Sequence, residues 1–93
     1  MKVVFDEEAL DDLQGIFAWV AKDDLTAATA LINRIFNKME KLAVPELSRM
    51  GRIGRDLGTH ELLEGSYIIV YEIDDRRARI RIIAIVHGAR DRG

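Results

Sequence analysis

The apolar residues of this chain gather in two adjacent runs near its C-terminus, at positions 67–73 (YIIVYEI) and 78–87 (ARIRIIAIVH). Both runs are rich in β-branched and aromatic residues, and the charged residues 74–77 separate them. This pattern is typical of two antiparallel strands joined by a tight connection. Because both faces of each run are largely apolar, we expect the hairpin to lie inside a sheet.

Strict alternation predicts which side chains share a face of this hairpin. In the first strand, one face holds Tyr67, Ile69, Tyr71 and Ile73, and the other holds Ile68, Val70 and Glu72. In the second strand, one face holds Ile80, Ile82, Ala84 and Val86, and the other holds Arg81, Ile83, Ile85 and His87.

A further strand and a helix are predicted at the N-terminus. Residues 2–5 form a short apolar run, Asp6 suits an N-cap, and the acidic residues after it complement the helix dipole. Apolar residues at helical spacing then cover one face: Ala9, Leu10, Leu13, Phe17, Val20 and Ala21. Ile16 and Trp19 fall beside this face, and we predict that they bind a partner. The alternative for Trp19 is packing against a loop of its own chain.

A second helix is expected from Leu25 or Thr26, after the break at residues 23–24, to the Val44-Pro45 step. Its apolar stripe is continuous: Leu25, Ala28, Leu31, Ile32, Ile35, Phe36, Met39, Leu42 and Ala43. Two helices with a short connection form an antiparallel hairpin, which must bury its stripe against the sheet.

Residues 46–58 (ELSRMGRIGRDLG) show little periodicity and are predicted to form a loop, followed by a short strand at 59–63. Arg52 and Arg55 flank Gly54, a combination that lets a backbone approach a ligand and suits an anion. The Gly-Lys-Ser/Thr signature of a nucleotide phosphate loop is missing from this segment. His87 ends the last strand, where its charge can change near neutral pH, and Arg90 follows closely. A hydrogen-bonded surface role is the alternative for His87.

The composition is that of a soluble globular protein, and we expect a single domain over residues 1–93. A net charge of −2 argues against a protein that coats nucleic acid. Residues 49–93 nevertheless carry nine basic side chains, all of them arginine, which suits a contact surface for carboxylate or phosphate. With no cysteine and two histidines, we expect no disulfide, metal or cofactor. No apolar stretch approaches the ~20 residues of a membrane span, so we expect no membrane contact and a cytoplasmic protein.

The order of strand, helix hairpin, arginine–glycine segment and three strands resembles the RelE/ParE superfamily of toxins from type II toxin–antitoxin systems. The most specific motifs run in order from Gly51 to Arg90: Gly51-Arg52, Gly58-Thr59-His60-Glu61-Leu62, Tyr67-Ile68-Ile69-Val70-Tyr71 and His87-Gly88-Ala89-Arg90. The resemblance covers essentially the whole chain. It implies an α+β fold of the order β-α-α-β-β-β, with an N-terminal strand and an antiparallel helix hairpin packed on a twisted, mainly antiparallel β-sheet. It also implies a cognate antitoxin and a higher-order toxin–antitoxin hetero-oligomer.

The superfamily has two activities. RelE-like members cut messenger RNA in the ribosomal A site with a basic surface and acid–base side chains. One of their cations follows the first tyrosine of the Tyr-x-x-x-Tyr strand, where this chain has Ile68, and others lie on the preceding strand, where it has Thr59, His60 and Glu61. Their arginine after the last strand matches Arg90, but their acid–base tyrosine has no counterpart in the residues that follow.

ParE-like members instead poison DNA gyrase through protein–protein contact, which requires no catalytic set. We therefore predict a ParE-like, gyrase-directed toxin without catalytic residues, whose partner-binding residues are Arg52, Arg55, His87, Arg90, Trp19 and Ile16. One alternative is a RelE-like endonuclease acting on ribosome-bound mRNA through His60, His87 and Arg90. Another is a non-toxic, degenerate binding module.

Overall fold

The computed structural model describes residues 1–88. Its elements, in chain order, are β1 (Lys2–Phe5), α1 (Glu7–Ala21), α2 (Leu25–Leu42), the 3-10 turn η1 (Pro45–Leu47), β2 (Arg52–Ile53), β3 (Thr59–Glu64), β4 (Tyr67–Asp74) and β5 (Arg79–His87). The helix hairpin, the N-terminal strand and the C-terminal hairpin were all expected from the hydrophobic pattern.

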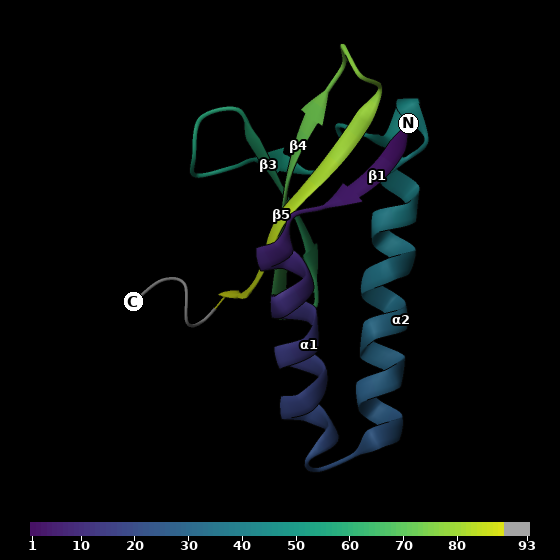
Figure 1. Cartoon of the computed structure of the whole chain (residues 1–93), viewed down its shortest axis with the longest axis vertical. Coiled ribbons are helices and arrows are strands. Elements are labelled where there is room, and N and C mark those ends of the chain that lie inside the picture. The colour runs from purple at the N-terminus through teal and green to yellow at the C-terminus, as the bar shows by residue number, and fades with distance from the viewer. Residues whose placement is uncertain (89–93) are drawn as a thin grey trace.

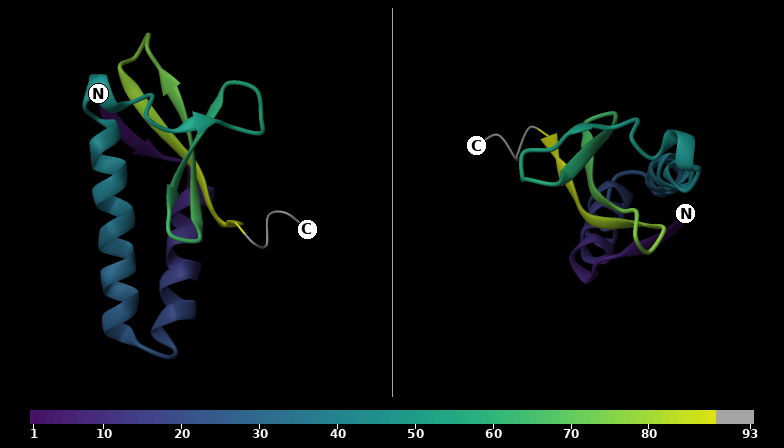
Figure 2. Two further views of the ribbon diagram at one scale, coloured as in Figure 1. Left: turned by 180° about the vertical axis from the view of Figure 1, so that it is seen from behind. Right: turned by 90° about the horizontal axis from the view of Figure 1, so that it is seen from above.

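The five strands form one sheet in the order β1-β5-β4-β3-β2. All neighbours are antiparallel except β1, which runs parallel to β5. Figure 1 shows the two helices side by side, and Figure 2 shows that they lie on one side of the twisted sheet. The predicted α+β architecture is confirmed.

The two helices begin in different ways. Asp24 caps α2, because its Oδ1 accepts a hydrogen bond from the Ala27 N–H at 3.0 Å. Asp6 stands at the N-cap position of α1, but its side chain makes no cap hydrogen bond. Its carboxylate accepts instead from Arg81 Nε at 2.9 Å, and Arg81 Nη1 also donates to Glu72 at 3.0 Å. Asp6 therefore ties the start of α1 to the sheet.

The core lies between the helix hairpin and the sheet. It contains, from the helices, Ala9, Leu13, Ile35, Met39 and Leu42, and from the strands, Leu62, Ile69, Tyr71, Ile80, Ile82 and Ile85. The predicted face of α1 was partly wrong. Ile16 packs against this core, whereas Leu10 and Phe17 are exposed. The buried face of α1 is thus turned toward Ile16, because the helix packs against β5 as well as α2.

A bulge in β5 overturns the predicted alternation of its second half. Tyr71 pairs with Ile82 and Val70 pairs with Ala84, so Ile83 has no partner on β4. Such an extra residue shifts the side-chain phase of the strand by one position. Ile85 consequently joins Ile80 and Ile82 in the core, and Ala84 and Val86 turn to the opposite face.

The segment predicted as a loop at 46–58 contains two further elements, η1 and β2. Strand β2 is only two residues long, and it pairs Arg52 with Glu61 and Ile53 with His60. A strand this short carries no alternation that could reveal it in sequence. Neither α1 nor α2, the two α-helices of the described chain, has the length and hydrophobicity that crossing a bilayer requires.

Asp12 of α1 provides a polar link between the helix hairpin and the edge of the sheet. Ile85 lies beyond the part of β5 that pairs with β1. Its backbone N–H donates to Asp12 Oδ2 at 2.9 Å, and Asp12 is half-buried. A helix carboxylate thus replaces the missing strand neighbour.

We expect Asp12→Ala to lower the free energy of unfolding by about 1–3 kcal/mol, because it leaves a half-buried N–H without an acceptor. The exposed neighbouring change Asp11→Ala is the matched control and should shift stability by less than about 0.5 kcal/mol. Urea unfolding of both variants measures the difference. Equal effects would mean that the Asp12 hydrogen bond contributes nothing to stability.

Candidate functional site

The arginine–glycine segment is fastened to the sheet by Tyr71. The hydroxyl of this fully buried side chain donates to the Ser48 carbonyl at 2.9 Å and accepts from the Gly51 N–H at 3.1 Å. Burial raises the pKa of the Tyr71 phenol, against the smaller lowering effects of the Gly51 hydrogen bond and of the Arg49 charge. The phenol therefore stays protonated at neutral pH and acts as a clamp for the segment.

Glycine at position 51 allows this clamp to close. A Cβ there would lie 2.6 Å from the Tyr71 hydroxyl and 2.7 Å from the Glu61 carbonyl oxygen. A side chain at Gly54 would likewise run into Thr59. The close backbone approach expected from these glycines is therefore made by the chain's own sheet.

Two of the three arginines of the segment contact one carboxylate, Arg52 through its guanidinium and Arg55 through its backbone. Arg52 Nε and Arg52 Nη2 both lie 2.9 Å from Glu61 Oε1, across the β2–β3 pair. The backbone N–H of Arg55 donates to Glu61 Oε2 at 3.3 Å. Arg52 is thus already paired with an anion from its own chain, in a solvent-accessible contact worth at most about 1 kcal/mol.

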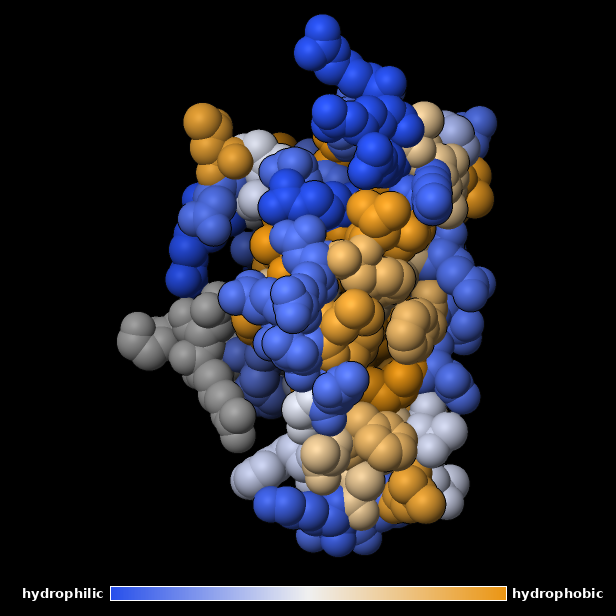
Figure 3. Space-filling model, viewed as in Figure 1, coloured by the Kyte–Doolittle hydropathy of each residue, from blue (hydrophilic) through white to orange (hydrophobic). Residues whose placement is uncertain are grey.

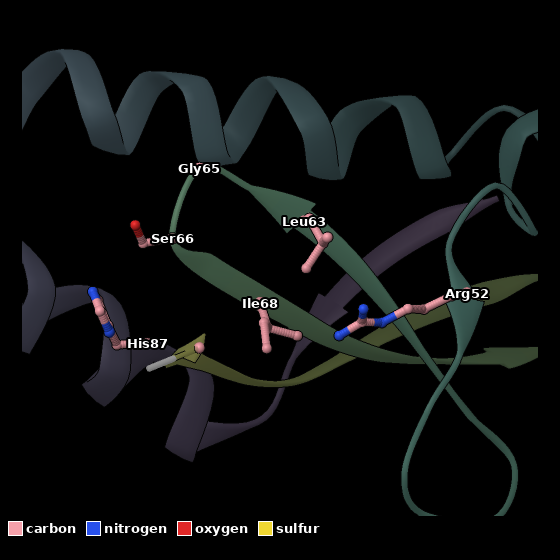
Figure 4. A pocket seen from close by; sticks show the side chains of 7 residues that line it. Arg52, Leu63, Gly65, Ser66, Ile68 and His87 are labelled. Carbon is pink, nitrogen blue, oxygen red and sulfur yellow. The ribbon is translucent and has the colours of Figure 1, made fainter. Parts of the chain in front are cut away.

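A pocket of about 280 Å³ opens on the face of the sheet opposite to the helices. It is lined by Arg52, Leu63, Gly65, Ser66, Ile68, His87 and Gly88. Figure 4 shows Arg52 reaching from β2 toward Ile68 and Leu63, whereas His87 stands at the other end near Ser66. The Gly88 N–H donates to the Ser66 carbonyl at 2.8 Å, which holds the end of β5 against the β3–β4 turn. The structure thus brings two of the predicted partner-binding residues, Arg52 and His87, to one pocket.

The two histidines occupy separate places, each packed on a tyrosine of β4. The His87 ring meets Tyr67 edge-on at 5.2 Å, and the His60 ring stacks on Tyr71 at 5.4 Å between ring centroids. These tyrosines are four residues apart on one strand, a separation of about 13 Å. Both histidine Nδ1 atoms are buried without a hydrogen-bond partner within the described residues. The structure therefore does not bring His60 and His87 together, and Arg90 lies outside the described residues.

Trp19 and Ile16 lie on α1, on the helical layer. Trp19 is 60% exposed, and the Lys22 ammonium lies 5.4 Å from its ring centroid. Ile16 is half-buried against the core. Figure 3 shows a band of hydrophobic side chains over the helix hairpin. Leu10, Phe17 and Phe36 are among the exposed large hydrophobic residues of the two helices.

In chemical terms, the pocket offers an aliphatic floor with a paired cation at one end and a histidine at the other. Within residues 1–88, no group of three or more histidine, cysteine or acidic side chains is placed to hold a metal ion. Sequence reasoning missed Tyr71 and Glu61, the two side chains that fix the arginine segment. The signal for Glu61 was its cross-strand position opposite Arg52, which requires β2 to be known.

Comparisons with known proteins agree with this fold. The sequence matches the family model described as the ParE toxin of type II toxin–antitoxin system, parDE, over residues 3–92. A chain of the chromosomal ParDE system from P. aeruginosa has a TM-score of 0.79 and 20% identity, covering 94% of this chain and 95% of that one. The RelBE2 toxin–antitoxin complex from Mycobacterium tuberculosis gives a TM-score of 0.60 and 24% identity, covering 92% and 95%. The isolated E. coli RelE toxin gives a TM-score of 0.64 and 15% identity, covering 92% and 82%. None of the curated proteins matches the chain.

We expect Tyr71→Phe to lower the free energy of unfolding by about 1–3 kcal/mol, because the Ser48 carbonyl and the Gly51 N–H both lose their partner. Amide exchange at Gly51 should also become faster. Tyr67→Phe is the matched control, since no hydrogen bond of its hydroxyl is seen within residues 1–88, and it should change stability by less than about 0.5 kcal/mol. Unchanged exchange at Gly51 in Tyr71→Phe would contradict the clamp.

Proposed function

We propose that this chain, which belongs to the family of ParE toxins of type II toxin–antitoxin systems, inhibits DNA gyrase through protein–protein contact and is neutralised by a cognate antitoxin. The toxin acts in the cytoplasm and assembles with its antitoxin into a hetero-oligomer. The family membership alone does not name a target. The choice of gyrase is argued from the residues that line the pocket.

The observation that carries the proposal is the position of Ile68. RelE-like nucleases are expected to have a cation directly after the first tyrosine of this strand. Here the residue is an isoleucine that is only 7% exposed and lines the pocket. An aliphatic floor gives no stabilisation to the negative charge that develops on a phosphate during RNA cleavage. It does suit the burial of an apolar side chain from a protein.

The bonding of other polar groups of the sheet supports the same proposal. Arg52 is held by Glu61, and the Tyr71 hydroxyl is fully used by Ser48 and Gly51. The His87 ring packs against Tyr67. Proton transfer requires an acid or base within hydrogen-bond reach of the reacting group. A protein-binding surface does not need such a group.

The second candidate is a RelE-like, ribosome-dependent mRNA endonuclease. It is favoured by one observation, namely that Arg52 and His87 line the same pocket. In the sequence, His87 is followed by Gly88, Ala89 and Arg90. An RNA backbone that entered this pocket would meet the Arg52 guanidinium at one end and the His87 imidazole at the other.

The antitoxin is proposed to cover exposed apolar side chains of the helical layer, including Trp19. A tryptophan that is 60% exposed is a suitable anchor, because aromatic residues dominate the binding energy of many interfaces. Ile16 lies next to this region on α1 and packs against the core, so it supports the surface from beneath.

We expect the purified protein to block supercoiling of relaxed plasmid by gyrase and to cause cleaved plasmid to accumulate. The effect should disappear when the cognate antitoxin, which we expect the neighbouring reading frame to encode, is added. Unaffected supercoiling at a high molar excess of the protein would rule out the proposed target.

Two further assays separate the remaining candidates. Cleavage of ribosome-bound mRNA that is lost in His87→Ala or Arg90→Ala would favour the nuclease. Expression that leaves growth unchanged, with or without the neighbouring reading frame, would indicate a non-toxic binding module.

We expect Trp19→Ala to weaken binding of the neighbouring reading frame's product by at least about tenfold, because an interface anchor is worth roughly 2 kcal/mol or more. The melting temperature should stay nearly unchanged, since the side chain is mostly exposed. Ile16→Ala is the comparison variant and should lower the melting temperature, because Ile16 packs against the core. Binding measured by titration calorimetry gives the answer, and unchanged affinity of Trp19→Ala would remove this residue from the interface.

A further inference from the structure

Glu61 places a negative charge beside the pocket. Its side chain lies on the same face of β3 as that of Leu63, which lines the pocket, because residues two apart on a strand point to the same side. Two nitrogens of Arg52, Nε and Nη2, each lie 2.9 Å from Glu61 Oε1. Figure 4 shows the same guanidinium reaching toward Ile68 on the floor of the pocket. The cation at this end of the pocket is therefore neutralised by a carboxylate from the neighbouring strand.

This carboxylate is held through both of its oxygens. Oε1 faces the Arg52 guanidinium, and Oε2 accepts from the Arg55 backbone N–H at 3.3 Å. The Glu61 side chain is 14% exposed, whereas that of Arg52 is 49% exposed. Turning Glu61 away from Arg52 would break both contacts of a mostly buried charge. The negative charge therefore stays next to the guanidinium.

The position of Glu61 decides which ligands the pocket accepts. An arginine has five N–H donors, and those of Nε and Nη2 face Glu61 here. A phosphate that approached the remaining donors would also approach the Glu61 carboxylate, and the repulsion of like charges weakens its binding. An apolar side chain that entered over Leu63 and Ile68 would meet no such repulsion.

The arginine segment has other fastenings to the sheet. The Tyr71 hydroxyl donates to the Ser48 carbonyl and accepts from the Gly51 N–H, both within the segment that precedes β2 or leads into it. Glu61 shares the task of holding the segment with this clamp. Its effect on the charge of Arg52 is a separate property, which can be measured apart from stability.

We propose that Glu61 is a specificity determinant of the pocket, which keeps the phosphate backbone of RNA away from Arg52 and reserves the pocket for a side chain of a protein. The inference rests on the proposed function in one respect, namely that the pocket receives a protein. It deepens that function, because it names the residue that separates protein recognition from RNA binding.

The test compares Glu61→Gln with Glu64→Gln. Both changes remove one negative charge from β3, and both release an arginine, because Glu64 pairs with Arg34 of α2 at 3.5 Å. The two glutamate side chains are almost equally exposed, at 14% and 16%. Arg34 belongs to the helical layer, on the side of the sheet away from the pocket. The pair therefore separates an effect in the pocket from an effect of net charge.

Affinity for a short fluorescein-labelled oligouridine RNA is measured by fluorescence anisotropy over a series of salt concentrations, together with the melting temperature. Glu61→Met is the second uncharged variant, and it keeps the length of the side chain. The double variant Arg52→Gln/Glu61→Gln shows whether a gain in affinity comes from Arg52. Inhibition of gyrase by the unchanged protein is measured beside these variants.

We expect Glu61→Gln and Glu61→Met to bind the RNA about tenfold more tightly than the unchanged protein at low salt, because Arg52 gains a charge-assisted contact. The plot of log affinity against log salt should become steeper by about 0.7, the value for one added phosphate contact on a single strand. The double variant should lose the gain. Glu64→Gln should stay within about twofold of the unchanged protein, because its released arginine is exposed and outside the pocket.

Unchanged RNA affinity in both Glu61 variants would overturn the assignment. An equal gain in Glu64→Gln would also overturn it, since the effect would then follow net charge and not the pocket. A gain that persists in the double variant would show that Arg52 is not the group that Glu61 controls. Absence of gyrase inhibition by the unchanged protein would contradict the proposed function and leave the RNA affinities as they are, so the two failures can be told apart.

Discussion

The structure depends on how β5 meets different neighbours along its length. Its first half is bordered by β1 and β4, whereas its second half has α1 at one edge. The bulge at Ile83 changes the side-chain phase between these halves, so Ile82 and Ile85 both reach the core although they are three residues apart. Without the extra residue, the side chain of Ile85 would face the opposite side of the sheet and leave the core. The same bulge turns His87 toward Tyr67.

The elements that are long enough to show a regular hydrophobic pattern could be predicted from the sequence. The details that depend on tertiary contacts could not. Both helices, β1 and the β4–β5 hairpin follow from local pattern. The bulge could not be predicted in this way, because Ile83 is as apolar as its neighbours and the sequence shows no break in the pattern at this position. The face of α1 was misjudged for a similar reason, since Leu10, Phe17 and Ile16 are equally apolar and only the contact with β5 decides which is buried. The pocket residues Arg52 and His87 were named from sequence, but the pairing of Arg52 with Glu61 depends on β2, which is too short to have a period.

The arginines of the C-terminal half illustrate how a charge pattern is used inside a small fold. The sequence predicted an anion-binding segment around Arg52 and Arg55. Several arginines of this half pair with carboxylates of the chain: Arg49 with Asp75, Arg52 with Glu61, and Arg81 with both Asp6 and Glu72, while Arg77 pairs locally with Asp74 at the exposed hairpin tip. Hydrogen bonds and charge from Arg77 lower the pKa of the Asp74 carboxyl. The guanidinium fork suits this use, because it reaches a carboxylate with two donors at once.

The parallel pairing of β1 with β5 has a consequence for folding during translation. The strand made first has no neighbour in the sheet until Arg79–Ile82 has been synthesised, and it stays unpaired while both helices emerge. The apolar faces of α1 and α2 likewise stay exposed until the strands that cover them have been synthesised. The nascent chain therefore cannot assemble its sheet strand by strand in the order of synthesis, and the sheet and the core beneath it form only after β5 has been synthesised.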